Sequence, residues 1–449
     1  MTVASADGGR EQDDDFVMIN ESAAHASSAM AQDHTLDLIS DYVDGVSNEL
    51  GAISLEIHDR PELQYKECHA HDVLTKFMAS QKGWTITRSA SNIDTAFVAV
   101  YDSGIKGPVV SLNAEYDALK GIGHACGHNL IAVASVAGAL AIAHLMEQNQ
   151  LAGRVVLFGT PAEEGGGGKI KLFDAGAYRD QEVDISLISH PGISSDAVLV
   201  RTAAYTAFKV EYFGKEAHAA ARPWDGINAL DALITAYSAI SVLRQQTEPG
   251  DIIQGMITNG GLRPNIIHAY SAGRFVVRSS TRARREALLK RVEACFEAGA
   301  LATGAKLKLT LGGSYDDHMP NKALGGSYRH CFNRLGGDIP IGSIDMLQSA
   351  TMASTDQGNI SYAMPSISPN FWIRSEDERG AQLGGPHTPD FERAARTEEA
   401  QQKAMRVGKA LAATALDVLT RPELLHEVKR EFEEMRHADK EARVKRGVQ

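Results

Sequence analysis

The chain has 449 residues, of which 43% are hydrophobic and 23% are charged, and this is the composition of a soluble globular protein. A chain of this length exceeds one ordinary hydrophobic core, so two domains are expected. The formal net charge of −12 argues against a nucleic-acid-binding protein, because such proteins usually present a basic surface.

Cysteine content and the N-terminal sequence predict a cytoplasmic protein. The four cysteines are widely spaced, which is not the pattern of a disulfide framework and suits a reducing compartment. The acidic N-terminus lacks the basic and apolar regions of a signal peptide. No apolar run of about 18 residues or more predicts a membrane span. Residues 1–35 contain few large apolar side chains, and we expect them to form a mobile tail.

The first part of the chain alternates helical and strand-like patterns. Apolar residues at helical spacing predict helices over 36–56 and 68–81. Short β-branched runs bounded by glycine or proline predict strands within 94–103, 107–117, 153–160 and 184–192. Strands of this kind between helices indicate a central, mostly parallel sheet that helices cover on both faces.

The pattern changes after residue 201. A strand, a helix, two strands, a helix and a strand follow, which is the β-α-β-β-α-β order of a ferredoxin-like unit. Helical and sheet patterns resume beyond it, so residues 201–314 are expected to be a domain inserted into a first domain formed by 36–200 and 315–449. A patterned helix over 397–419 and a charged, exposed helix after it close the chain.

The segment "GIGHACGHN" carries the first candidate for chemistry. On extended backbone, side chains two residues apart point the same way, so His124, Cys126 and His128 could share a face. Imidazole and thiolate are preferred zinc ligands. In an isolated motif of this kind, the cysteine and histidines are more often buried packing residues than metal ligands. Other features of the chain must therefore decide between these two interpretations.

Three further segments supply ligand types. Glu163 and Glu164 precede four glycines, His190 ends an apolar strand, and His387 follows a Gly-Gly-Pro sequence. Taken singly, the glutamates would be an exposed loop pair and the histidines would be structural. Ligands bind at strand ends in α/β sheets, so the three segments together with Cys126 and His128 indicate one shared site. The combined set has enough ligands for two metal ions: Cys126, His128, one of Glu163 and Glu164, His190 and His387.

Two metal ions about 3.5–4 Å apart can hold an attacking water and polarise a carbonyl group. The carboxylate that binds no metal could take the proton from the water and pass it to the leaving amine. Asp117 could lie behind a ligand and orient it.

Over residues 36–420 the chain resembles the amidohydrolase branch of the zinc aminoacylase/carboxypeptidase G superfamily. That branch includes the IAA-amino-acid hydrolases, the aminobenzoyl-glutamate hydrolases and the β-alanyl-lysine dipeptidase type. The resemblance rests on motifs that occur in the order of that family: "HDRPEL", "AEYDAL", "GHACGHN", "TPAEEGGGGK", "SHPG", "GKEAHAAARPWDGINALDA", "RPNIIHAYSAGRFVVRS", "STDQGNISY" and "GPHTPDF".

The resemblance implies a catalytic α/β domain with a dinuclear metal site and an inserted lid domain that forms a homodimer. It implies that Glu163 is the general base and that His218 stabilises the oxyanion, often across the dimer. Asn265 and Arg278 match the pair that holds the carbonyl and carboxylate of the substrate. Without the resemblance, His218 would be interpreted as a surface histidine and Arg278 as a solvated strand arginine. The implied metal ligands are Cys126, His128, Glu164, His190 and His387.

Glu115 and Asn129 are more similar to the dipeptidase and aminobenzoyl-glutamate types than to the IAA-amino-acid hydrolases, which have aspartate at both positions. We therefore predict hydrolysis of an amide bond in a small N-acyl amino acid or dipeptide by a metal-bound water. The expected cofactors are two divalent ions, zinc first, with manganese, cobalt and nickel as alternatives. In a dipeptidase, a pocket carboxylate such as Glu115 or Asp356 could bind the free amine of the substrate.

The alternative is a catalytically silent relative that binds small peptides or metabolites, or that regulates a partner subunit. Loss of a ligand or of Glu163 would favour that alternative, and neither is lost.

Overall fold

The computed structural model describes residues 23–448. Helix α1 (Ala23–His58) begins inside the segment predicted to be a tail. The residues from Ala23 to Ala31 are rich in alanine, whose helix propensity is the highest of all residues, and this favours a helical backbone there. Residues 23–35 of the predicted tail thus have a helical backbone, and residues 1–22 lie outside the described part of the chain.

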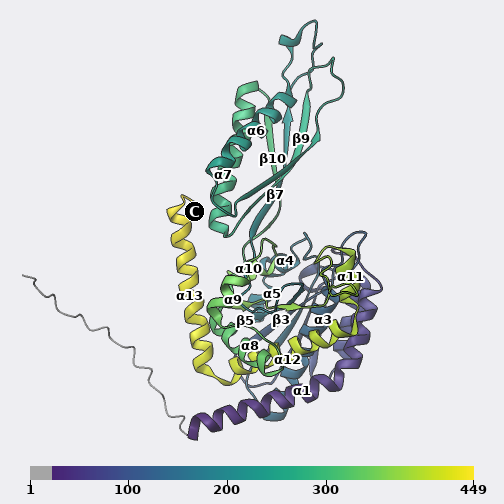
Figure 1. The fold of residues 1–449 in the computed structure, drawn as a ribbon, viewed down its shortest axis with the longest axis vertical. Coiled ribbons are helices and arrows are strands. Elements are labelled where there is room, and N and C mark those ends of the chain that lie inside the picture. Colours follow the sequence, from purple (N-terminus) through teal and green to yellow (C-terminus); the bar gives the residue numbers. More distant parts are fainter. Residues whose placement is uncertain (1–22, 449) are drawn as a thin grey trace, which may run out of the picture.

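A mixed sheet forms the centre of the larger part of the molecule (Figure 1). β3 pairs parallel with β4 and β5, and β5 pairs parallel with β11, whereas β1 and β2 add an antiparallel edge. This confirms the predicted mostly parallel central sheet. Its order within residues 23–448 is β1 (Trp84–Arg88), β2 (Phe97–Asp102), β4 (Arg154–Thr160), β3 (Val109–Glu115), β5 (Ile185–Leu187) and β11 (Ser366–Ile367).

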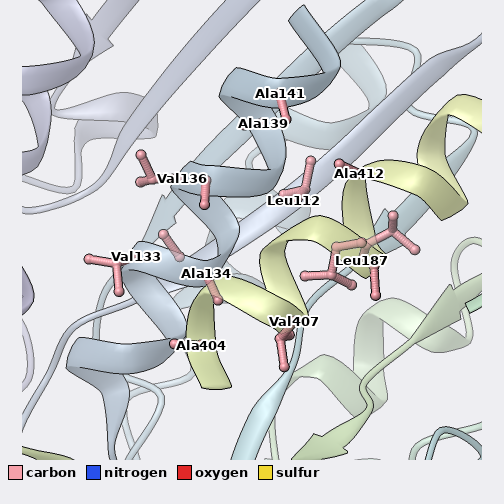
Figure 2. Packing of buried hydrophobic residues seen from close by; sticks show 14 of the residues in the cluster. Leu112, Val133, Ala134, Val136, Ala139, Ala141, Leu187, Ala404, Val407 and Ala412 are labelled. Carbon is pink, nitrogen blue, oxygen red and sulfur yellow. The ribbon is translucent and has the colours of Figure 1, made fainter. Parts of the chain in front are cut away.

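Helices α3 (His128–Asn149) and α12 (Glu398–Thr420) pack against each other and against β3, with α1 beside them. Figure 2 shows Leu112 of the sheet among the alanine and valine side chains of the two helices. Gly138 and Gly408 allow close approach, since a Cβ at Gly138 would lie 3.2 Å from the Gly408 oxygen. α3 is long and apolar enough to cross a membrane, but 94% of that stretch is buried inside the fold, as in the core helix of a globular protein.

A second unit, residues 204–315, has its own antiparallel sheet and its own core. Its elements follow the predicted order: β7 (Ala204–Phe213), α6 (Ala229–Leu243), β8 (Ile252–Asn259), β9 (Tyr270–Ser279), α7 (Arg282–Thr303) and β10 (Lys306–Tyr315). The strand order is β10-β7-β9-β8, and α6 and α7 cover one face of the sheet (Figure 1).

The C-terminal helix α13 (Pro422–Lys445) is not simply an exposed helix, as the charged sequence suggested. It buries Leu424, Val428 and Phe432, and it runs from α8 to α7 of the second unit (Figure 1). Arg282 of α7 binds Asp439 of α13 with an N–O distance of 2.5 Å. Leu424 and Val428 thus pack in the core of the larger part, whereas Asp439, further along the same helix, contacts the second unit.

Shorter elements connect these parts. They are α2 (Cys68–Ser80), α4 (Gly168–Asp174), α5 (Ala177–Asp180), β6 (His190–Gly192), α8 (Lys322–Arg334), α9 (Gly342–Gln348), α10 (Gln357–Ser361), β12 (Asn370–Trp372) and α11 (Pro389–Ala395).

Candidate metal centre

Three neighbouring parallel strands place the candidate residues at one edge of the central sheet. β3, β4 and β5 all end there, because parallel strands share a direction. Asp117 lies two residues beyond β3, Glu163 and Glu164 follow β4, and His190 begins β6 just after β5. The carboxyl ends of parallel strands are the usual place for a ligand in α/β folds.

All five predicted metal ligands meet at this edge. Within each of two groups, Cys126–His128–His190 and Cys126–Glu164–His387, the ligand atoms lie within 4.8 Å of one another. The Cys126 sulfur lies 3.3 Å from Nε2 of His190, and Nε2 of His387 lies 3.2 Å from Oε1 of Glu164. Residues from four separate segments of the chain thus form one cluster.

A glycine directs Cys126 and His128 into the cluster. Gly127 has a φ of 72°, and a Cβ there would lie 2.5 Å from Cγ of Pro191. The chain turns at Gly127 into α3, so it is not extended as expected, and His124 does not share the face of the other two residues. His124 lies in none of the ligand groups among the described residues, and its ring packs 6.0 Å from that of His58.

A tight turn after β4 directs the two glutamates. Ala162 has a φ of 60°, which is uncommon for a residue with a side chain. Its N–H donates to Oε1 of buried Glu67 at 3.0 Å, and its carbonyl accepts from Gly166 at 2.9 Å. Gly168 lies so close to the start of the turn that a Cβ there would overlap the Pro161 carbonyl oxygen. Strained backbone of this kind is common at functional sites.

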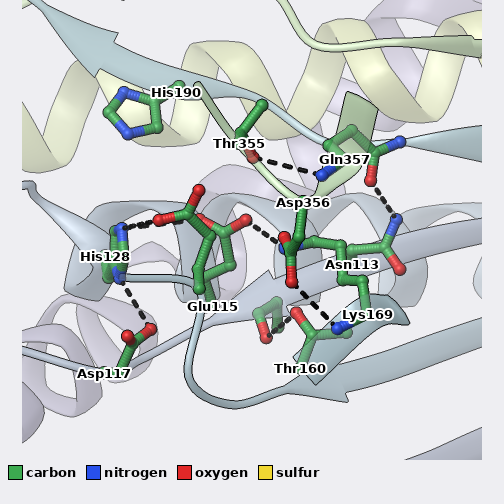
Figure 3. Close-up of polar contacts among 12 residues, drawn as sticks. Asn113, Glu115, Asp117, His128, Thr160, Lys169, His190, Thr355, Asp356 and Gln357 are labelled. Atoms are coloured by element: carbon green, nitrogen blue, oxygen red, sulfur yellow. Dashed lines mark hydrogen bonds and ion pairs between the residues drawn. The ribbon is translucent and has the colours of Figure 1, made fainter. Parts of the chain in front are cut away.

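Asp117 makes the contacts expected of a residue that orients a ligand. Its Oδ1 lies 3.0 Å from Nδ1 of His128, and its Oδ2 accepts from the backbone N–H of Glu164 at 3.0 Å. Nε2 of His128 therefore points toward the carboxylates of Glu115, Glu163 and Glu164, as Figure 3 shows for Glu115.

A buried lysine stands behind the glutamates, and sequence reasoning missed it. Nζ of Lys169 donates to Glu115 and, at 2.6 Å, to Asp356, and the backbone N–H of Lys169 donates to Asp356 at 2.9 Å (Figure 3). All three side chains are buried. Glu115 and Asp356 are therefore occupied by Lys169. The sequence-based suggestion that one of them binds the amine of the substrate is not supported. The position of Lys169 directly after four glycines was the available signal.

Burial and neighbouring charges shift the pKa values of the two adjacent glutamates in opposite directions. Burial, and then the nearby carboxylates of Glu115 and Glu164, raise the pKa of Glu163 well above its usual value. Burial would also raise the pKa of Glu164, but the hydrogen bond with His387 and the charge of His128 lower it to about 2. Glu163 is thus suited to hold a proton, whereas Glu164 stays ionised and suited to bind a cation.

The cluster fits divalent cations. Nε2 of His128 and Oε2 of Glu115 are buried without a hydrogen-bond partner, which is costly unless another group satisfies them. Sulfur, imidazole and carboxylate donors are those that zinc binds, and a metal ion would hold Cys126 as the thiolate although burial raises the pKa of that thiol. Negative charge is also in excess beside Lys169, because this one ammonium faces the carboxylates of Glu115, Glu163 and Asp356.

The structure does not bring His218 or Asn265 to this cluster within one chain. The end of β10 is near the cluster, since the Tyr315 hydroxyl donates to the Glu163 carbonyl at 2.6 Å. The loops with His218 and Asn265 follow the opposite ends of β7 and β8, and the backbone N–H of Ala219 donates to the Asn265 carbonyl at 3.1 Å. A ten-residue strand spans about 30 Å, so both residues lie roughly that far away.

Arg278 lies much nearer the cluster, because the end of β9 that carries it contacts the segment before Asp356. Its Nη1 donates to the Met352 carbonyl at 3.0 Å and to Oγ of Ser354 at 2.9 Å. Its guanidinium lies 5.1 Å from the centre of the Tyr205 ring. Both hydrogen bonds use Nη1, so the remaining nitrogens of the guanidinium can bind another group.

The model of the peptidase family M20/M25/M40 matches residues 109–414. The Xaa-Arg dipeptidase of Homo sapiens is 39% identical over 406 residues, which cover 87% of this chain and 90% of that protein. One p-aminobenzoyl-glutamate hydrolase chain of Escherichia coli is 29% identical, and the match covers 66% of this chain and 65% of that one. A dinuclear metal binding peptidase of the M20 family from Bacillus subtilis shares the fold, with a TM-score of 0.62 and 19% identity over 83% of this chain and 99% of that one.

Proposed function

The chain belongs to the peptidase family M20/M25/M40, and on that premise we propose that it hydrolyses the amide bond of a small dipeptide or N-acyl amino acid with two divalent metal ions. The observation that carries the proposal is the convergence of five metal-ligand side chains on a buried cluster that also contains Glu163. The 39% identity to proteins named Xaa-Arg dipeptidase favours a dipeptide as the substrate.

The metal ions would bind to Cys126, His128, Glu164, His190 and His387. When bound, such ions acidify water and polarise a carbonyl group. Zinc is the metal that this donor set favours, with manganese, cobalt and nickel as alternatives. Asp117 accepts the Nδ1 hydrogen of His128 and so keeps Nε2 available for the metal.

Glu163 would act as the general base. It is adjacent to a ligand, and burial and neighbouring carboxylates raise its pKa, so its carboxylate form would be a stronger base toward the attacking water than an exposed glutamate. The same carboxyl would then deliver that proton to the leaving nitrogen. Arg278 would bind the carboxylate of the substrate with the guanidinium nitrogens that face away from Met352 and Ser354.

The second unit would act as a lid and as the contact of a homodimer. His218 and Asn265 lie about 30 Å from the cluster of their own chain, so a role in catalysis requires the site of a second copy. An edge for such a contact is present, because β8 pairs only with β9 in the described part of the chain. Apolar side chains are exposed on the adjoining elements: Ile234, Tyr237 and Val242 of α6, and Met256 and Ile257 of β8.

We also propose that the enzyme works in the cytoplasm, which its reduced cysteines support: Cys68, Cys126, Cys295 and Cys331 are all free thiols in the structure.

Amine release from a panel of dipeptides and N-acyl amino acids tests the proposal. Each substrate is added to chelator-treated protein and again after zinc, manganese, cobalt or nickel is restored. We expect turnover only with metal, and best with dipeptides. Glu163→Gln should lose turnover and retain bound metal. Folded, metal-loaded protein that releases no amine from any substrate would favour the catalytically silent alternative.

A mixing experiment tests the dimer. His218→Ala and Glu163→Gln proteins, each inactive alone, are combined under conditions that exchange subunits. Because a mixed dimer would hold one intact site, activity should return. Absence of recovery after proven subunit exchange would contradict the role of His218 in a neighbouring site.

A further inference from the structure

The glycine loop, residues 165–168, follows the proposed general base and needs outside support. Its backbone adopts conformations that favour glycine, with φ of 128° at Gly165 and 65° at Gly167. Glycine backbone has the largest conformational freedom in the unfolded and loosened states. The position of Glu163 therefore depends on what holds this loop.

Tyr315 holds the loop at two points. Its hydroxyl donates to the carbonyl of Glu163 at 2.6 Å and accepts from the N–H of Gly167 at 3.0 Å. The side chain is buried, and its ring packs edge-on against Tyr205 with 5.0 Å between ring centres. One hydroxyl thus bridges the two ends of the turn that presents Glu163.

Tyr315 does not belong to the central sheet. It is the last residue of β10 and pairs with Tyr205 of β7, at the junction between the second unit and the rest of the molecule. Lys169, at the other end of the loop, is bound by Asp356, and the segment before Asp356 also meets the second unit through the hydrogen bond of Arg278 to Ser354. Both ends of the glycine loop are therefore connected to the second unit.

We propose that Tyr315 is a positioning residue that couples the placement of the second unit to the orientation of Glu163. The inference rests on the proposed function, in which Glu163 is the general base. A movement of the second unit relative to the central sheet would move the Tyr315 hydroxyl, and the Glu163 carbonyl and Gly167 would move with it or lose their bonds. Correct placement of the base would then require correct placement of the second unit.

The variant Tyr315→Phe tests this, since phenylalanine keeps the ring against Tyr205 and removes only the hydroxyl. A small misplacement of a catalytic group costs up to roughly 100-fold in rate, so we expect kcat to fall about 10–100-fold. KM, the bound metal content and the melting temperature should stay near the wild-type values. Backbone amide hydrogen exchange of the peptide over residues 161–169 should become about fivefold faster or more.

Tyr212→Phe is the matched control. Tyr212 is a buried tyrosine of the same sheet, and its hydroxyl donates to the Phe296 carbonyl at 2.7 Å, away from the glycine loop. This variant should leave kcat and the exchange of residues 161–169 unchanged.

Unchanged exchange of residues 161–169 in Tyr315→Phe would overturn the proposal, as would a wild-type kcat. A large fall in melting temperature or in metal content would also overturn it, because Tyr315 would then have a general structural role. If the wild-type protein cleaves nothing in the substrate panel, the proposed function fails by that result, whereas the exchange measurement still decides whether Tyr315 holds the loop.

Discussion

Removal of the buried ammonium of Lys169 should destabilise the protein in a way that depends on pH. Lys169 is fully buried, and its two partners, Glu115 and Asp356, are buried as well. Loss of one partner from a buried ion pair typically costs about 3–5 kcal/mol, because the remaining charge is left without compensation. We expect Lys169→Met to lower the free energy of unfolding by about this amount at neutral pH.

The pH dependence follows from proton binding. Without the ammonium, two buried carboxylates remain side by side, and one of them will bind a proton in the folded state. Burial already raises the pKa of Asp356 to about 6 in the presence of Lys169. Above about pH 6 the folded variant therefore holds one proton that both the folded wild type and the unfolded chain have released. The stability difference should grow by about 1.4 kcal/mol for each unit of rising pH.

The assay is urea unfolding of metal-free protein, followed by circular dichroism between pH 5.5 and 8. The double variant Lys169→Met/Asp356→Asn is the control: it removes one carboxylate as well, and asparagine can still accept the backbone hydrogen bond of residue 169. It should recover most of the lost stability and flatten the pH dependence. A loss below about 1 kcal/mol, or a difference that does not change with pH, would refute the assignment of a desolvated, charge-compensating lysine.

Three further predictions concern other sites. Asp117→Asn should weaken metal binding by about 10–100-fold, because it removes the acceptor that orients His128; competition with a chelating dye measures this. Burial lowers the pKa of His318 to about 4. As the pH falls from about 6.5 to 4, the unfolded chain therefore binds a proton that the folded state does not, and up to about 3 kcal/mol of stability is lost. In urea unfolding, the stability of His318→Asn should therefore depend less steeply on pH in this range. Gly168→Ala should lose activity or fail to fold, since its Cβ would overlap a backbone oxygen, whereas Gly326→Ala, with open space around the Cβ, should match the wild type in activity and melting temperature.

The elements of the fold were largely predictable, because each depends on local periodicity. Strands β3 and β4 are β-branched runs between glycine, proline and polar residues, and the second unit follows the predicted β-α-β-β-α-β order. Helix α13 was predicted as a helix but not as a link between the two parts, because an apolar stripe of Leu424, Val428 and Phe432 does not reveal what it packs against.

The sequence by itself determined which residues could bind metal and which strand ends carry them. Cysteine, histidine and glutamate are distinctive ligand types, and their places after apolar strands can be recognised without coordinates. The sequence could not show that His124 lies outside the ligand cluster that contains Cys126 and His128. That difference depends on the turn at Gly127 and on its contact with Pro191.

Only the tertiary structure decided how the groups behind the ligands are paired. Lys169 meets Glu115 from 54 positions earlier and Asp356 from 187 positions later, and Tyr315 meets Glu163 across 152 positions. A local pattern carries no information about such pairs, since they form when packed elements bring distant segments together. Burial then sets their charge states, because the same carboxylate that is an ordinary acid in water needs a cation or a proton once it is removed from solvent.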